Sequence, residues 1–248
     1  MRKRWVRHVC LGGVVVATAL VTGAVPASAE PGDSSAYAAD VSVRVHHGPS
    51  LDLGPLAASA ADGPVTARHA TVTAPGVLTT GLVSSGAARD DATGAVHAEA
   101  SLTDVRLILG QLGKIGAVKV VCDATQSGTT GATSLTHVAL PGVSVAANPE
   151  PNTTLAAPPG PIPASLVSVV FNEQIHNDDG SLTINGVHLR LTPELGSGDI
   201  ILGRATCGLP CPPIPLASGL GLWLGLGLLT LAAVPVGVVV RRRHRAVV

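Results

Sequence analysis

The sequence predicts an all-β ectodomain, folded as an antiparallel β-sandwich, with an N-terminal signal peptide and a single C-terminal transmembrane helix. Short runs rich in β-branched residues recur along the chain, and Gly, Pro, Asn and Asp cluster between them, which predicts strands joined by turns. No long stretch repeats its apolar residues with the 3.6-residue period of a helix. An uncharged apolar run near the C-terminus predicts the membrane span.

The N-terminus has the three-part pattern of a secretory signal peptide (1–29). A basic segment (1–8) precedes an apolar run (9–25), and small residues follow Pro26. We therefore predict cleavage before Glu30, which places the following domain outside the cytoplasm. The alternative is an uncleaved N-terminal anchor.

Residues 216–240 carry no charge and are predicted to form a transmembrane helix. At about 1.5 Å per residue, the run spans the ~30 Å hydrocarbon core of a bilayer with some tilt. A basic cluster directly after a span marks its cytoplasmic side. Here the cluster consists of Arg241, Arg242, Arg243 and Arg245. We predict a single-pass cell-membrane protein with an extracellular domain (30–208), a Pro-rich linker (209–215) and a cytoplasmic tail (241–248). The alternative is a buried core helix.

Two glycines in the predicted span have the spacing that lets helix backbones approach each other closely. They are Gly221 and Gly225, and they suggest a homodimer as one alternative. Gly and Leu alternate densely in this region, however, so chance explains the spacing better. The tail after Val240 is too short to fold, which disfavours a role in signalling.

The composition of segment 30–213 argues against several kinds of binding site. It holds eight Lys and Arg against sixteen Asp and Glu, a formal charge of 8 − 16 = −8, which disfavours binding to nucleic acid. Its aromatic residues are Tyr37 and Phe171, too few for the stacking platforms of a lectin or a single-strand binder. We expect no cofactor and no metal. A Ca²⁺ site at Asp178-Asp179 and a zinc site at the Cys-x3-Cys spacing are weak alternatives, because neither has the remaining ligands.

The predicted strands belong to one domain. In chain order they are 40–45, 64–74, 76–84, 95–109, 117–122, 134–140, 165–171, 182–191 and 199–205. Residues 102–113 could instead form a short helix. Six prolines make segment 148–164 unsuitable for a central strand, so we interpret it as an irregular crossing within the domain. Alternatively, it separates two subdomains.

Three cysteines remain after signal cleavage and face an oxidising exterior, where disulfides persist. We favour a bond between Cys122 and Cys207, because each ends a strand-like run. A bond between Cys207 and Cys211 is the rival. Either pairing leaves one thiol over, and Cys211 beside the membrane could be free or form an intermolecular bond.

Residues 165–191 are predicted to form a β-hairpin with its turn at 177–180. Its matching apolar pairs are Val167–Leu191, Val169–Leu189 and Phe171–Val187. The turn at 177–180 places His176 opposite Ser181 and Glu173 opposite Ile184. The positions of the apolar residues in the second strand change from even to odd at Asn185-Gly186, which predicts a β-bulge there. The opposite, polar face is expected to be solvated. Its residues are Ser168, Asn172, Gln174, His176, Ser181, Thr183, His188 and Arg190.

Glu173 is the candidate functional acid of this hairpin. Its parity places it on the apolar side, where a lone carboxylate would be costly. We favour a second bulge near Asn172, or an edge location, that turns Glu173 to water. The alternative is a hydrolase in which Glu173 acts as acid or base with His188 or Asp199.

Several segments carry a resemblance to a known family. They are "SSAY" (34–37), "PGVL" (75–78), "VKVVCDA", "NEQ", "SLTINGVHLRL" and "GDIILGRATC". Together they resemble the actinobacterial secreted proteins called the choice-of-anchor P family, over most of 34–208. The resemblance implies a cell-envelope protein with a shared extracellular domain and no established activity, so it assigns no functional residues. It also suggests that Cys122 and Cys207 are paired.

These observations predict a membrane-anchored surface protein whose ectodomain is structural, adhesive or docking and is not an enzyme. Its partner would be an unknown protein or an envelope polymer. The alternative is a cell-envelope hydrolase that uses Glu173. The hydrolase requires Glu173 within hydrogen-bond reach of a second titratable group, whereas the surface module predicts no perturbed acid/base pair in a concave pocket.

Overall fold

The structure is a computed structural model and describes residues 32–46, 48, 50–109, 112–141, 144–155 and 167–211. The predicted signal peptide, membrane span and cytoplasmic tail lie outside these residues, so they stay predictions. In the described ranges, no helix has the length and apolar character needed to cross a bilayer.

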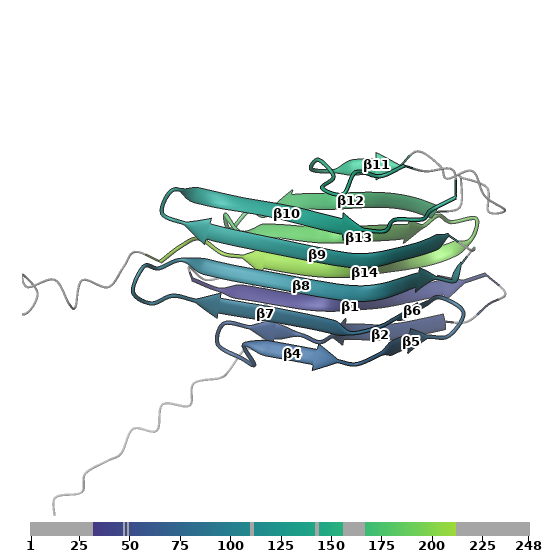
Figure 1. Ribbon diagram of the computed structural model, residues 1–248, viewed down its shortest axis with the longest axis horizontal. Coiled ribbons are helices and arrows are strands. Elements are labelled where there is room, and N and C mark those ends of the chain that lie inside the picture. Colours follow the sequence, from purple (N-terminus) through teal and green to yellow (C-terminus); the bar gives the residue numbers. More distant parts are fainter. Residues whose placement is uncertain are drawn as a thin grey trace, which may run out of the picture.

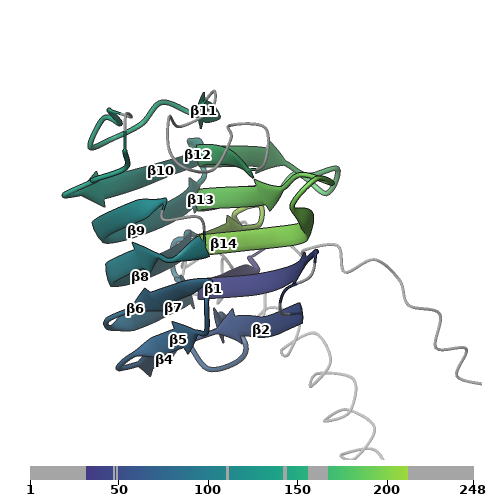
Figure 2. The same cartoon turned by 90° about the vertical axis from the view of Figure 1, so that its right-hand side faces the viewer.

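Two antiparallel sheets of seven strands each pack face to face, which confirms the predicted all-β antiparallel architecture. Figures 1 and 2 show the two layers. In the first sheet the strand order is β11-β12-β13-β14-β1-β2, and β3 pairs with β1. The strand bounds are β1 Ser34–Val45, β2 Ser50–Leu56, β3 Ser59–Ala60, β11 Thr153–Leu155, β12 Val167–His176, β13 Leu182–Leu191 and β14 Gly196–Cys207.

The second sheet has the order β10-β9-β8-β6-β5, with β7 also paired to β8 and β4 paired to β7. Its bounds are β4 Thr66–His69, β5 Val72–Ala74, β6 Leu78–Thr80, β7 Val83–Arg89, β8 Val96–Leu107, β9 Gly113–Thr125 and β10 Gly128–Thr136. Because β8 continues to Leu107, residues 102–107 are a strand and not the alternative helix. The Pro-rich crossing contributes the short β11, which lies at an edge of the first sheet.

The core fills the space between the inner faces of the two sheets. It consists mainly of Val, Leu, Ile and Ala side chains, together with the two disulfide cysteines and Phe171, which is fully buried. The apolar face of the predicted hairpin is part of it, since Val167, Val169, Val187 and Leu189 are also buried. Burying this face stabilises the sandwich by the removal of apolar area from water.

The register of the hairpin agrees with the prediction on one side of Asn172 and differs on the other. The pairs Val167–Leu191, Val169–Leu189 and Phe171–Val187 are confirmed. Near the turn, however, Glu173 pairs with Asn185 and His176 with Leu182, so the expected bulge with one extra residue is wrong. The two strands keep one register throughout.

The facing of side chains changes along a line that crosses four strands of the first sheet. On each strand, two inward-facing residues are separated by three positions instead of two. These residues are Phe171 and Gln174, Ile184 and Val187, Leu202 and Ala205, and Ala36 and Ala39. The residues on the line itself are Asn172, Gly186, Gly203 and Ala38, and we call them the transverse line. Since all four strands shift together, no extra residue is needed.

Glycine is required on the transverse line by close approach of the other sheet. A Cβ on Gly186 would lie 2.5 Å from Cγ2 of Val120, and one on Gly203 would lie 2.7 Å from the same atom. Gly203 also has a φ of 74°, and Asn172 has a φ of 50°, a conformation that Asn tolerates better than most residues. The line therefore lets Val120 of β9 pack against the backbone of β13 and β14.

The two ends of the described chain lie side by side at one end of the sandwich. The backbone N–H of Gly32 donates to the carbonyl of Leu209 (2.7 Å), and that of Gly208 donates to Asp33 (2.8 Å). The N–H of Cys211 donates to the carbonyl of Gly94, just before β8 (3.1 Å). The disulfide lies at this same end, which we call the terminal end.

Candidate functional site

The candidate site is a polar network on the outer face of the first sheet. Glu173 on β12 lies beside Asn185 on β13 because the two residues pair in the ladder. His188 and Arg190 follow on the same face of β13, and Arg190 pairs with Asp199 of β14. Glu173 reaches this face because the backbone turns at Asn172.

Both oxygens of the Glu173 carboxylate are occupied. Its Oε2 accepts a hydrogen bond from Nδ2 of Asn185 (2.7 Å) and lies 2.5 Å from Nδ1 of His188. Its Oε1 accepts from Nη2 of Arg190 (2.8 Å). On the far side of the imidazole, Nε2 of His188 lies 3.0 Å from Oδ1 of Asp199. Glu173, His188 and Asp199 therefore form a chain, closed by Arg190, whose Nε lies 3.7 Å from the same Asp199 oxygen.

The electrostatics of the network favour an ionised Glu173. Burial alone would raise the pKa of its carboxyl group. Hydrogen bonds from Asn185 and His188, together with electrostatic attraction from His188 and Arg190, outweigh burial and hold the pKa of Glu173 below its ordinary value. The residue is only 9% exposed, so its charge is compensated by protein groups more than by water.

A second polar group continues the same face toward β1. Arg204 pairs with Asn185 in the ladder, and its Nη1 donates to the hydroxyl of Tyr37 (3.1 Å). The guanidinium lies 5.7 Å from the centre of the Tyr37 ring, and burial raises the pKa of this tyrosine. Burial and the charge of Asp52 also raise the pKa of the nearby Asp40. The face thus alternates acidic and basic groups across four strands.

Two polar atoms of this face have no hydrogen-bond partner among the described residues. They are Oδ1 of Asn185 and Nε of Arg204, both buried. The amide of Asn185 is committed to Glu173 through its Nδ2, and Arg204 is committed to Tyr37. The hydrogen bonding of the network is therefore incomplete. Each unpaired buried polar atom lowers the stability of the fold.

Two hollows among the described residues lie away from this network. One is a small apolar space in the core beside Phe171, and the other is on the outer face of the second sheet, lined by Arg106 and Lys114. A carboxylate with both oxygens bound and a lowered pKa is poorly suited to donate a proton as a general acid. What the arrangement does well is to hold β12, β13 and β14 together by charge-assisted hydrogen bonds.

The structure corrects several expectations about this hairpin. Ser181, Thr183 and His188 were expected on a solvated face, but all three side chains are buried. Glu173 does leave the core side near Asn172, but it enters the network and not open water. Asn172 and Gln174 were expected on the solvated face. They instead face the second sheet, where Asn172 bonds to Thr133 and Gln174 to the carbonyl of Gly131. Because the local alternation is broken at Asn172, the parity rule fails for the residues that follow it.

The hydrogen-bond condition of the hydrolase alternative is met, since Glu173 contacts His188 and His188 contacts Asp199. The sequence analysis named these residues but not the contacts of Glu173 with Arg190 and Asn185. The signal that could have found them is spacing: the two outward residues Asn185 and His188 are three positions apart, as the transverse line requires. Among the described residues, no group of three His, Cys, Asp or Glu side chains could hold a metal ion.

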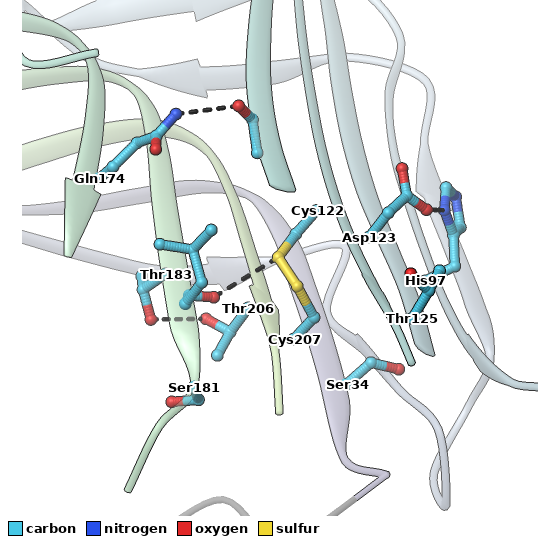
Figure 3. Close-up of a disulfide and its surroundings, with 12 residues drawn as sticks. Ser34, His97, Cys122, Asp123, Thr125, Gln174, Ser181, Thr183, Thr206 and Cys207 are labelled. Carbon is cyan, nitrogen blue, oxygen red and sulfur yellow. Dashed lines mark hydrogen bonds and ion pairs between the residues drawn. A yellow bond between two sulfur atoms is a disulfide. The ribbon is translucent and has the colours of Figure 1, made fainter. Parts of the chain in front are cut away.

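The cysteines lie as the favoured pairing expects. Cys122 of β9 and Cys207 of β14 form a disulfide, with their Cα atoms 5.9 Å apart, and it links the two sheets (Figure 3). Next to it, the hydroxyls of Thr183 and Thr206 are 3.0 Å apart. Cys211 is half-buried and outside this bond. Gly221 and Gly225, and the basic cluster after the span, lie outside the described residues.

Compared with known protein families, curated proteins and solved structures, the chain matches none. The resemblance to the choice-of-anchor P family stays a prediction.

Proposed function

We propose that the chain is a membrane-anchored cell-surface protein whose β-sandwich has a structural, adhesive or docking role and no catalytic role. The observation that carries the proposal is the state of Glu173. Its carboxylate is held by Asn185, His188 and Arg190, and its pKa lies below the ordinary value. The best candidate acid of the described domain therefore serves the sheet and has no free oxygen for a reaction.

The arrangement of the chain ends supports the anchoring part of the proposal. Gly32 and Cys211 lie together at the terminal end. A span at 216–240 would begin a few residues beyond Cys211, so it would hold the terminal end close to the lipid. The opposite end of the sandwich, which carries the end of β8 and the start of β9, would then face outward.

The anchoring is tested by protease treatment of intact cells. One epitope tag is placed in the exposed turn at Gly63 and a second after Val248. We expect both tags in the membrane fraction, with the first removed by external protease and the second protected. A full-length chain released into the medium, or a C-terminal tag cleaved on intact cells, would overturn the proposal.

A second candidate function, a cell-envelope hydrolase, is favoured by the contact between Glu173 and His188 (2.5 Å) and by the contact of His188 with Asp199. In this case Glu173 would act as acid or base, and His188 would connect it to Asp199. The full-length protein is purified and mixed with purified cell envelopes, and soluble fragments are measured. Fragment release that Glu173→Gln abolishes and the exposed-site control Glu99→Gln preserves would favour the hydrolase over the docking role.

A further inference from the structure

A hollow of about 330 Å³ opens on the outer face of the second sheet, away from the network of Glu173. The residues that matter in its lining are Asp104, Arg106, Lys114, Gly116 and His137. They come from the end of β8, the start of β9 and the residue after β10. Since Gly94 before β8 contacts Cys211, the hollow lies at the far end of the sandwich from the chain ends.

The hollow exists because the second sheet also changes its side-chain facing. Residues that face the core on its strands are again three positions apart: Leu102 and Val105, Ile115 and Val118, and Leu135 and the partly buried Val138. Between them lie Asp104, Gly116 and His137. Asp104 and His137 have φ values of 49° and 48°. Gly116 leaves the space between these two side chains open, since a Cβ there would stand 2.9 Å from the Cβ of His137.

Two cations without an ion-pair partner among the described residues border this space. Arg106 and Lys114 are paired directly on β8 and β9, so their side chains lie next to each other on the same face of the sheet. Neither forms an ion pair with a residue that the structure describes. Lys119, on the same face of β9, is instead paired with Glu99 (3.2 Å). His137 adds a third nitrogen-bearing side chain.

Asp104, the carboxylate in this lining, is oriented in part toward the side of β8 that faces away from β9 and Lys114. One of its oxygens lies 3.1 Å from the position that a Cβ on Gly81 would take, on the side of β8 away from β9. Its charge is therefore directed toward the segment between β6 and β7. A guanidinium and an ammonium group on neighbouring strands are left facing the hollow without a described counter-ion.

We propose that this hollow binds the phosphate group of a small phosphate monoester. Arg supplies a planar fork that can bind two oxygens at once, and Lys supplies a compact charge, so together they suit a tetrahedral dianion. The volume is at the lower end for small-molecule sites. The net charge of −8 over 30–213 (8 − 16) repels long polyanions, which favours a small ligand over a polymer. This site would specify the class of ligand for the proposed docking role. Its biological meaning rests on that proposed function, but the binding itself does not.

Binding is measured with the full chain in a zwitterionic detergent at low salt, by calorimetry and by amide chemical shifts. The probes are inorganic phosphate, glycerol 3-phosphate and acetate. We expect both phosphates to bind, acetate to bind at least about tenfold more weakly, and shifts to concentrate at Arg106, Lys114, Gly116 and His137. Tighter binding of glycerol 3-phosphate than of inorganic phosphate identifies an ester ligand, and equal binding identifies free phosphate as sufficient.

Arg106→Gln and Lys114→Gln should each weaken phosphate binding about tenfold, whereas Arg106→Lys should retain most of it. Lys119→Gln is the matched control, because it removes one positive charge from the same face but outside the hollow. All these side chains are exposed, so the midpoint of thermal unfolding should not change. The inference is overturned by equal binding of acetate, by an equal loss of affinity in Lys119→Gln, or by the absence of shifts at the hollow. These outcomes are independent of the protease experiment, so the docking ligand and the membrane anchor can fail separately.

Discussion

Glu173 illustrates how one backbone residue decides the environment of a charge. Had the strand kept its alternation through Asn172, the carboxylate would point between the sheets, where an unpaired charge is very costly. The positive φ of Asn172 turns it to the outer face, where Asn185, His188 and Arg190 receive it. A buried charge with several partners is tolerated, but removing one partner leaves the others uncompensated.

Replacing Glu173 with Gln should therefore destabilise the domain. The change keeps the shape of the side chain but removes the charge that accepts bonds from His188 and Arg190. We expect the free energy of unfolding to fall by about 1–3 kcal/mol, measured by denaturant titration. Glu99→Gln is the matched control, because Glu99 pairs with Lys119 in an exposed position, and its loss should cost at most about 0.5 kcal/mol. Equal effects of the two changes would contradict a structural role for the network.

The same pair of proteins gives a pH dependence whose sign follows from the lowered pKa of Glu173. A carboxyl group with a folded-state pKa below its unfolded value stabilises the fold above that unfolded value, and this contribution is lost as the pH falls through the folded pKa. The stability difference between the native protein and Glu173→Gln should be constant near neutral pH and shrink below the ordinary value of 4.5. Unfolding titrations at several pH values check this, and a difference that grows on acidification would contradict it.

At the scale of the elements, the main feature is the transverse line through Asn172, Gly186, Gly203 and Ala38. At this line, the side chains of β12, β13, β14 and β1 change the face of the sheet to which they point. The second sheet shows the same change at Asp104, Gly116 and His137. Each line includes glycine positions, which lack a side chain: Gly186 and Gly203 in the first sheet and Gly116 in the second. In the first sheet Val120 fills the space, and in the second the space opens outward as the hollow.

Gly186→Ala tests the tight packing at this line. The new Cβ would lie 2.5 Å from Cγ2 of Val120 and 2.9 Å from the carbonyl oxygen of Leu202, so the sheets must move apart locally. We expect a loss of about 1–3 kcal/mol of unfolding free energy. Gly63→Ala, whose Cβ would meet its nearest atom at an ordinary 3.5 Å, should have little effect. Adding Val120→Ala to Gly186→Ala should cost less than the sum of the two single changes, and simple additivity would argue against the contact.

Much of the fold could be predicted from the sequence, because strand alternation and turn residues are local signals. The pairs from Val167–Leu191 to Phe171–Val187 followed from apolar parity alone. The error began at Asn185-Gly186, where the parity of one strand changes. In the sequence of a single strand, a β-bulge and a change of facing shared by four strands produce the same shift in the spacing of apolar residues. The contacts of His188 with Asp199, and of Arg204 with Tyr37, depend on which strands are neighbours, and alternation does not specify that.

In the whole molecule, the disulfide joins the sheets at the terminal end. Cys122 and Cys207 are separated by 85 positions in the sequence, so their bond restricts a long loop of the unfolded chain. Both cysteines are fully buried among the core residues. The hydrogen bonds of Gly32, Gly208 and Cys211 close the same end of the sandwich. This end is therefore held by covalent and backbone bonds, in contrast to the hollow at the other end.

Removing the disulfide by the double change Cys122→Ala and Cys207→Ala should lower the free energy of unfolding by about 2–5 kcal/mol. Denaturant unfolding measures the effect, and peptide mass analysis without reductant checks the pairing in the native protein. Cys211→Ser is the control and should leave both the linked peptide and the stability unchanged. A peptide that links Cys207 to Cys211 would contradict the pairing.

The separation of the two ends also governs how the domain would respond to mechanical tension. A pull between Cys211 and a molecule seated beside Arg106 would run lengthwise along the strands. Hydrogen bonds loaded in this shear direction must rupture together, whereas bonds peeled from one edge rupture in succession. Through Cys207 and Cys122, the load would also pass from β14 into β9 of the opposite layer. Under such a load, the two layers would share the strain through this bond.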